Sequence, residues 1–139
     1  MTEIRLQVGA KAFLRNKEGK YLLLKRNKDK YAEVKGGWDI VGGRIDPGSR
    51  LIENLEREIK EETQLKIVSE PVIIYAQDII PNEERHVVRL SYITDTEGEP
   101  ILDLSENVEY KWLTLEEMRS QEDLDIYVKD IIAKGLIKE

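Results

Sequence analysis

Residues 49–63 (SRLIENLEREIKEET) are the segment that most constrains what this chain can fold into. Leu51, Ile52, Leu55 and Ile59 recur at the three- and four-residue spacing of an amphipathic α-helix. Such a helix has to bury its apolar stripe against another element, and strand-like segments on both sides make a sheet the expected partner. The sequence therefore predicts a helix of about four turns that covers one face of a sheet.

The rest of the chain predicts strands, turns and two further helices. Residues 4–14 alternate apolar and polar side chains, and the apolar run 21–26 follows the turn NKEGK, so these two segments are expected to form a hairpin. Further strands are expected at 38–41, 72–79, 86–94 and 108–113, of which the middle two form a second hairpin.

Two helices are expected near the C-terminus. Thr114 and Glu117 have the spacing of a capping box, and Leu124, Val128 and Ile131 recur at helical spacing before Gly135. Strands mixed with three helices, without a repeating βα unit, favour an α+β fold over a doubly wound sheet. We expect an α/β/α sandwich with a mixed central sheet.

Composition favours one globular domain over residues 1–139, because hydrophobic residues make up 40% of the chain and charged residues 36%. The net charge of −6 argues against nonspecific binding of nucleic acid. The absence of cysteine excludes disulfides, thiolate zinc sites and cysteine nucleophiles. With no signal-peptide pattern and no apolar run near the ~20 residues that span a bilayer, we expect a cytoplasmic protein without membrane association.

The charges of the helix at 49–63 fall into two groups. Glu53 with Arg57 and Glu56 with Lys60 are acid-first pairs four positions apart, each worth about 0.2–0.5 kcal/mol on a solvated face.

Glu58, Glu61 and Glu62 form the second group and lack such partners. Glu58 and Glu62 make a like-charge pair of similar cost, and Glu62 points toward the packed side, where desolvation adds to that cost. Carboxylates at this spacing converge beside the helix, and Mg²⁺ or Mn²⁺ accepts such ligands together with water and substrate phosphates. The group therefore predicts metal-assisted chemistry on a phosphate compound.

Together with the preceding glycine-rich turn, these residues resemble the Nudix box of the MutT-like hydrolases. The family pattern is a glycine, five residues, a glutamate, seven residues and then R-E-U-x-E-E-x-G-U, where U is a bulky aliphatic residue. The corresponding segments here are Gly43, RIDPG, Ser49, RLIENLE and REIKEETQL, the last covering residues 57–65. The order of the surrounding strands and helices also resembles the family.

The resemblance implies Mg²⁺- or Mn²⁺-dependent hydrolysis of a nucleoside diphosphate linked to another group X. Glu58 and Glu62 would be the main metal ligands, and Glu61 a further ligand or the group that orients water. Arg57 would hold the acidic cluster in place, and Gly43 would let the loop approach the metal.

A later glutamate serves as ligand or base in many members of the family. Glu106 is the best match in this chain, with Glu99 and Glu109 as alternatives. For the substrate, the candidates to line a pocket that binds anions are Arg26, Lys35 and Arg44. Trp38 is a candidate to stack on a base, with packing in the core as the alternative.

Two positions depart from the family pattern. Ser49 replaces the glutamate expected to brace the arginine, and Glu53 is our candidate to take over that role. Ser49 is also a candidate N-cap of the helix. Gln64 replaces the glycine that usually ends the helix in a left-handed conformation, which should cost on the order of 1 kcal/mol or shift the helix end.

Three functions stay open at this point. The favoured one is a MutT-like nucleoside triphosphate pyrophosphohydrolase, acting on a small nucleotide. An ADP-ribose or nucleotide-sugar diphosphatase is the alternative to which Pro81 points, because related enzymes often have a proline near that position. A non-catalytic nucleotide-sensing module is suggested by Ser49. The family also contains many dimers, so a homodimer is possible.

Overall fold

A computed structural model describes residues 3–29 and 37–138 of the chain. The strands are, in chain order, β1 (Arg5–Arg15), β2 (Tyr21–Arg26), β3 (Trp38–Asp39), β4 (Val41–Arg44), β5 (Lys66–Ile67), β6 (Val72–Asn82), β7 (Arg85–Glu97) and β8 (Asn107–Leu113). The helices are α1 (Leu51–Thr63), α2 (Leu115–Arg119) and α3 (Ile126–Ala133).

The strands build a mixed sheet in the order β3-β2-β1-β7-β5, with β4 also paired to β1, β6 to β7 and β8 to β2. β1 and β7 run parallel over their whole common length, from Arg5 beside Arg85 to Arg15 beside Asp95. The other pairings are antiparallel. Because β4 lies against the middle of β1, its two glycines, Gly42 and Gly43, pair with Lys11 and Ala10 near the centre of the sheet.

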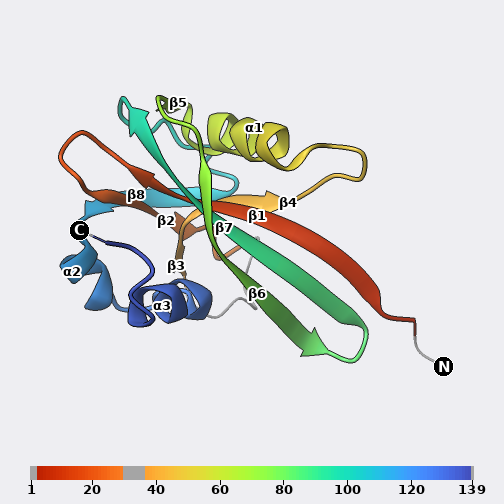
Figure 1. The fold of residues 1–139 in the computed structure, drawn as a ribbon. Helices are drawn as coiled ribbons and strands as arrows, with labels where there is room; N and C mark the ends of the chain where they lie inside the picture. Colours follow the sequence, from red (N-terminus) through yellow and green to blue (C-terminus); the bar gives the residue numbers. More distant parts are fainter. Residues whose placement is uncertain (1–2, 30–36, 139) are drawn as a thin grey trace.

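Helices cover both faces of this sheet (Figure 1). On one face, Leu55 and Ile59 of α1 are buried against Ala10, Ala12 and Leu14 of β1. On the other face, side chains of α2 and α3 pack with Phe13, as do Leu23 and Trp38. The expected α/β/α sandwich with a mixed sheet and three helices is therefore confirmed.

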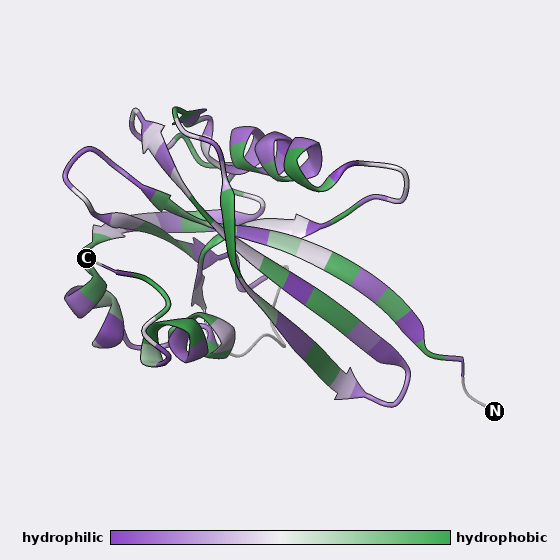
Figure 2. Cartoon of the chain, in the orientation of Figure 1, coloured by the Kyte–Doolittle hydropathy of each residue, from purple (hydrophilic) through white to green (hydrophobic). Residues whose placement is uncertain are grey.

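The alternation of hydrophobic and hydrophilic residues along β1 and β7 is visible in Figure 2. The first hairpin is nevertheless confirmed only at its turn, because β1 and β2 pair at a single position, Arg15 with Tyr21. Beyond it, β1 takes β4 and β7 as its neighbours, while β2 takes β3 and β8. Local alternation identifies a strand but does not select its partner, and these partners are remote in sequence.

Helix α1 begins two residues later than predicted. Arg50 is its N-cap, in an extended conformation and without a side-chain capping bond, so the expectation that Ser49 caps this helix is wrong. At the other end, Gln64 adopts the left-handed conformation with φ 56°, and its N–H donates to the Lys60 carbonyl oxygen. The helix thus keeps the family's end geometry with a glutamine in the strained position.

Both C-terminal helices are present, but α3 begins at Ile126, so Leu124 lies before the helix that was expected to carry it. Thr114 and Glu117 form the reciprocal capping box at the start of α2. In the described part of the chain, no helix is both long and apolar enough to cross a membrane.

Candidate active site

Glu62 and Glu58 lie along one edge of α1, facing the glycines of β4. The Gly42 N–H donates to Glu62 Oε2 over 3.1 Å, and Asn107 Nδ2 donates to Glu62 Oε1 over 3.3 Å. Two elements remote in sequence thus fix the Glu62 carboxylate, β4 before the helix and β8 after it. The predicted orientation of Glu62 toward the packed side agrees with this arrangement.

The two glycines of β4 pack closely on their neighbours, and at Gly42 the approach excludes a side chain. Gly42 has φ 131°, and a Cβ there would lie 2.2 Å from the carbonyl oxygen of Ala10. A Cβ on Gly43 would lie 3.4 Å from the carboxyl group of Glu58, so the bare backbone leaves room beside that carboxylate. This contact brings predicted metal-site residues Gly43 and Glu58 together.

Burial sets the charge of these carboxylates. It raises the pKa of Glu62 to about 7, and the nearby Glu58 adds to the rise, whereas the Lys11 ammonium group opposes it. Burial also raises the pKa of Glu58, against the effect of the neighbouring Arg57. Two clustered carboxylates with raised pKa values are groups that a divalent cation would hold in the ionised form.

The carboxylates fit Mg²⁺ or Mn²⁺ as a pair of protein ligands, with the other ligands coming from water and substrate. Within the described ranges, no group of three or more histidine, aspartate or glutamate side chains is arranged to enclose a metal. Mg²⁺ commonly uses only one or two protein carboxylates and takes its other ligands from water and substrate phosphates. Glu58 and Glu62 can supply that pair.

Glu61 and Arg57 form the outer side of this helix edge. Arg57 Nη1 donates to both carboxylate oxygens of Glu61, at 3.1 and 3.3 Å. Arg57 Nη2 lies 2.9 Å from Asp46 Oδ2 and 3.5 Å from Glu58 Oε1. In the described part of the chain the carboxylate partners of Arg57 do not include Glu53, so the prediction that Glu53 braces this arginine is wrong.

A buried ion network that the sequence analysis missed lies beside the carboxylates. Asp39, only 2% exposed, accepts hydrogen bonds at Oδ2 from Lys11 Nζ over 2.8 Å and from Arg26. Its Oδ1 accepts from Arg89 Nη2 over 3.0 Å. These cations hold the pKa of Asp39 well below its usual range despite complete burial.

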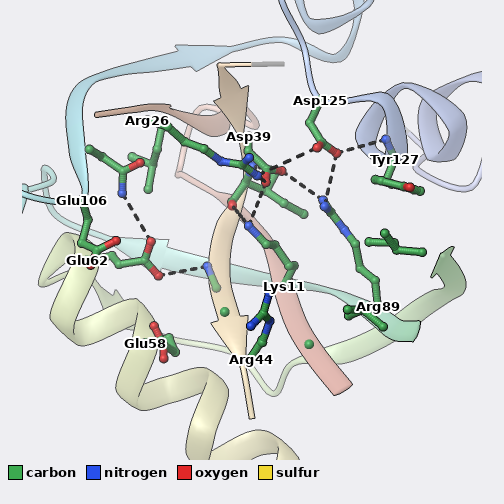
Figure 3. A pocket seen from close by; sticks show the side chains of 18 of the residues that line it. Lys11, Arg26, Asp39, Arg44, Glu58, Glu62, Arg89, Glu106, Asp125 and Tyr127 are labelled. Carbon is green, nitrogen blue, oxygen red and sulfur yellow. Dashed lines mark hydrogen bonds and ion pairs between the residues drawn. The ribbon is translucent and has the colours of Figure 1, made fainter. Parts of the chain in front are cut away.

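Asp125 closes the network from the side of α3. Its Oδ2 accepts from the backbone N–H groups of Tyr127 and Val128, which makes it the N-cap of α3. The same oxygen lies 3.2 Å from Arg89 Nη1. The Arg89 guanidinium is 5.6 Å from the centre of the Tyr127 ring. Figure 3 shows this network opposite Glu58, Glu62 and Glu106.

A signal for these residues was present in the sequence. Lys11 interrupts the small and apolar run VGAKAFL, and Arg89 interrupts HVVRLSY. We interpreted residues 4–14 as a half-buried strand, but Phe13, on the same face as Lys11, is fully buried. A charge on a strand with two covered faces needs partners, because an unpaired buried charge is too costly.

The carboxylate edge and the ion network line one open pocket of about 1020 Å³. Its lining includes residues predicted to bind the metal or take part in catalysis and residues predicted to bind the substrate, namely Arg26, Gly43, Arg44, Glu58, Glu61, Glu62 and Glu106. Hairpin residues Pro81 and Arg85 contribute a further wall, and Ile126 and Tyr127 another. The pocket is therefore acidic along α1 and mixed, with several cations, across the sheet.

Of the predicted substrate residues that the structure describes, one does not line this pocket. Trp38 is 5% exposed, packs in the core beside α2 and α3, and does not line the pocket. Its position corresponds to the core-packing alternative. Lys35 lies outside the described residues.

Comparison with known proteins matches residues 5–134 to the NUDIX domain. Proteins named nucleoside triphosphatase NudI are 31% identical in Salmonella paratyphi B, over 137 residues, and 25% identical in Escherichia fergusonii, over 130 residues. Each match covers 86% of this chain and 91% of the relative. The crystal structure of a MutT protein from Methanosarcina mazei Go1 superposes with a TM-score of 0.80 and 27% identity, covering 96% of this chain and 95% of that one.

The matched domain spans nearly the whole chain and contains every residue of the pocket. The fold of the MutT structure agrees over the same extent. The chain therefore belongs to the Nudix hydrolase family.

Proposed function

We propose that this protein is a Mg²⁺- or Mn²⁺-dependent nucleoside triphosphate pyrophosphohydrolase. One observation carries the proposal: Glu58 and Glu62 converge on one wall of a pocket whose opposite wall presents Lys11, Arg26 and Arg89. A triphosphate chain needs both a divalent cation and further positive charge, and this pocket can provide for both.

In this proposal Glu58 and Glu62 hold the cation, and Gly43 leaves room for it beside Glu58. When bound, the ion would polarise a phosphoryl oxygen and lower the pKa of the attacking water. Lys11 and Arg26 are held by Asp39 in orientations that limit their motion, so they can position phosphate oxygens at little further cost in entropy.

Glu61 and Glu106 are the proposed groups that orient or deprotonate water. Both line the pocket, Glu61 on α1 and Glu106 just before β8. Their roles are separable, because Glu61 is also a partner of Arg57.

The relatives named nucleoside triphosphatases favour this substrate class over others. A second candidate, an ADP-ribose or nucleotide-sugar diphosphatase, is favoured by Pro81, which lines the pocket wall formed by the hairpin. Both reactions release a nucleoside monophosphate. The second product is pyrophosphate in the first reaction and a sugar phosphate in the other.

The test is a substrate panel with Mg²⁺ and with Mn²⁺ at slightly alkaline pH, containing the common ribo- and deoxyribonucleoside triphosphates and ADP-ribose. We expect nucleoside monophosphate and pyrophosphate from at least one triphosphate, and loss of that activity in Glu62→Gln. Reaction in ¹⁸O-labelled water then identifies the phosphorus that is attacked.

Release of a sugar phosphate in place of pyrophosphate would support the second candidate. Nucleotide binding without turnover of any compound would contradict both and leave a nucleotide-sensing module. Homodimer formation stays a prediction, which sedimentation of the same preparation checks.

A further inference from the structure

Arg57 is held firmly in this chain although the glutamate that usually braces it is replaced by Ser49. Its Nη2 group donates to Asp46 Oδ2 over 2.9 Å and to Asn54 Oδ1 over 3.0 Å. Asp46 lies in the turn between β4 and α1, three positions before Ser49. Asn54 lies on α1, one turn before Arg57.

Asn54 is an unusual residue for its position. It is fully buried on the side of α1 that otherwise carries Leu55 and Ile59. A buried amide is costly unless it is hydrogen-bonded. Here its oxygen accepts from the backbone N–H of Asp46 at 3.2 Å as well as from Arg57, and its nitrogen lies 3.5 Å from the Arg44 carbonyl oxygen.

Asn54 thus fastens both ends of the segment 44–46 to the helix. That segment follows directly after Gly43, which adjoins the Glu58 carboxyl group. A fastened segment fixes the distance between the glycines of β4 and the carboxylates of α1.

Asp46 places a negative charge beside the guanidinium group of Arg57. Arg57 has carboxylate neighbours at Asp46, Glu61 and Glu58, the last at 3.5 Å. If Asp46 were neutral, Arg57 would turn more fully to Glu58. That closer ion pair would compete with a cation for the same carboxylate.

We propose that Asp46 and Asn54 are positioning residues that replace the missing glutamate at position 49, so that Arg57 is braced without drawing Glu58 away from the metal. This inference rests on the proposed metal site of Glu58 and Glu62. It gives a reason for the departure at Ser49, because the bracing charge lies three positions earlier, in the same turn before α1.

The test is Mn²⁺ binding to the full-length protein, measured by electron paramagnetic resonance of free Mn²⁺, with hydrolysis measured in parallel. For Asp46→Asn we expect affinity for Mn²⁺ to fall by about 10-fold, as for other groups that orient metal ligands. Asp46 has a side chain that is 73% exposed, so its loss should leave the thermal midpoint nearly unchanged.

Glu53→Gln is the matched control. Like Asp46→Asn it removes one negative charge, but from a side chain of α1 that is not among the described partners of Arg57. It should leave Mn²⁺ affinity within the error of the measurement. Ser49→Glu in the Asp46→Asn background returns a carboxylate to the family position and should restore most of the lost affinity. Asn54→Ala should weaken binding as Asp46→Asn does, and should also lower the thermal midpoint because Asn54 is buried.

Arg57 itself gives a metal-free measurement. Its Nη–Hη resonances in ¹⁵N-labelled protein should exchange with water faster in Asp46→Asn than in the parent and in Glu53→Gln, because Nη2 donates to Asp46. Equal Mn²⁺ affinity in Asp46→Asn and Glu53→Gln would overturn the proposal, and so would failure of Ser49→Glu to restore binding. If the expected Mn²⁺ series is found in a protein that hydrolyses no nucleotide, the proposed function fails and the bracing role stands.

Discussion

Glu62 lies half-buried at the edge of α1, between Glu58 and the Lys11 ammonium group. Its pKa of about 7 in the folded chain compares with the ordinary value of 4.5 for a glutamate carboxyl. Below pH 4.5 the carboxyl is protonated in both the folded and the unfolded chain and adds no penalty. As the pH rises from there to 7, only the unfolded chain loses the proton freely, so folding stability falls and the penalty is complete above pH 7.

Glu62→Gln should therefore stabilise the metal-free protein while abolishing its activity. We expect the free energy of unfolding at pH 8 to rise by about 1–3 kcal/mol, because the glutamine never bears the buried charge. Urea denaturation with a chelator present measures this difference. At pH 4 the two proteins should unfold at the same urea concentration, and a stabilisation of equal size at both pH values would refute the explanation by ionisation.

The same proton competes with the metal. Since a carboxylate binds Mg²⁺ or Mn²⁺ only after losing its proton, Mn²⁺ affinity should fall by about 10-fold per pH unit below pH 7. Titrations of Mn²⁺ between pH 5.5 and 8 check this slope, at roughly constant ionic strength. Affinity that is independent of pH over this range would mean that Glu62 does not ligate the ion.

At the scale of elements, α1 shows what a sequence pattern can determine. The apolar stripe predicted the helix and the face that it buries, and the like-charge cluster predicted the edge that faces the pocket. The pattern could not locate Asp46 as the partner of Arg57, because that contact depends on how the turn after β4 folds back. Nor could it find Asp39 and Asp125, whose importance comes from strands and a helix that meet only in the folded chain.

The C-terminal end of α1 offers an independent change in stability. Gln64 is exposed and has φ 56°, a conformation that glycine adopts without steric cost. Gln64→Gly should raise the free energy of unfolding by about 0.5–1 kcal/mol. Thermal or urea denaturation measures it, with Gln121→Gly, at a position whose own φ is not positive, as the control expected to give no gain. Loss of stability in Gln64→Gly would show that the side chain matters more than the backbone strain.

At the scale of the whole molecule, the network around Asp39 joins this β3 residue to side chains from four other places in the fold. Lys11 comes from β1, Arg26 from β2, Arg89 from β7 and Asp125 from the start of α3. Asp39 is the common acceptor of the three cations. Its removal would leave Arg89, which is 4% exposed, with much less compensation for its buried charge.

Asp39→Asn should accordingly cost about 3–5 kcal/mol of stability, measured by urea denaturation at pH 7. Asp95→Asn is the matched control, because Asp95 also pairs with an arginine, Arg15, but at the surface with both side chains more than a third exposed. Breaking that pair should cost no more than about 1 kcal/mol. Equal losses in the two variants would show that the network around Asp39 is no more important to the fold than a surface pair.

The parallel ladder between β1 and β7 also limits how early the sheet can form during synthesis of the chain. Each pair in this ladder joins residues 80 positions apart, as Arg15 and Asp95 do. At about 5–20 residues per second, a ribosome makes β7 some 4–16 s after β1. Strand β1 is therefore synthesised well before its parallel partner, and during that interval its edge toward β7 lacks the backbone hydrogen bonds of the ladder. Contacts of such long range also predict slow folding in vitro.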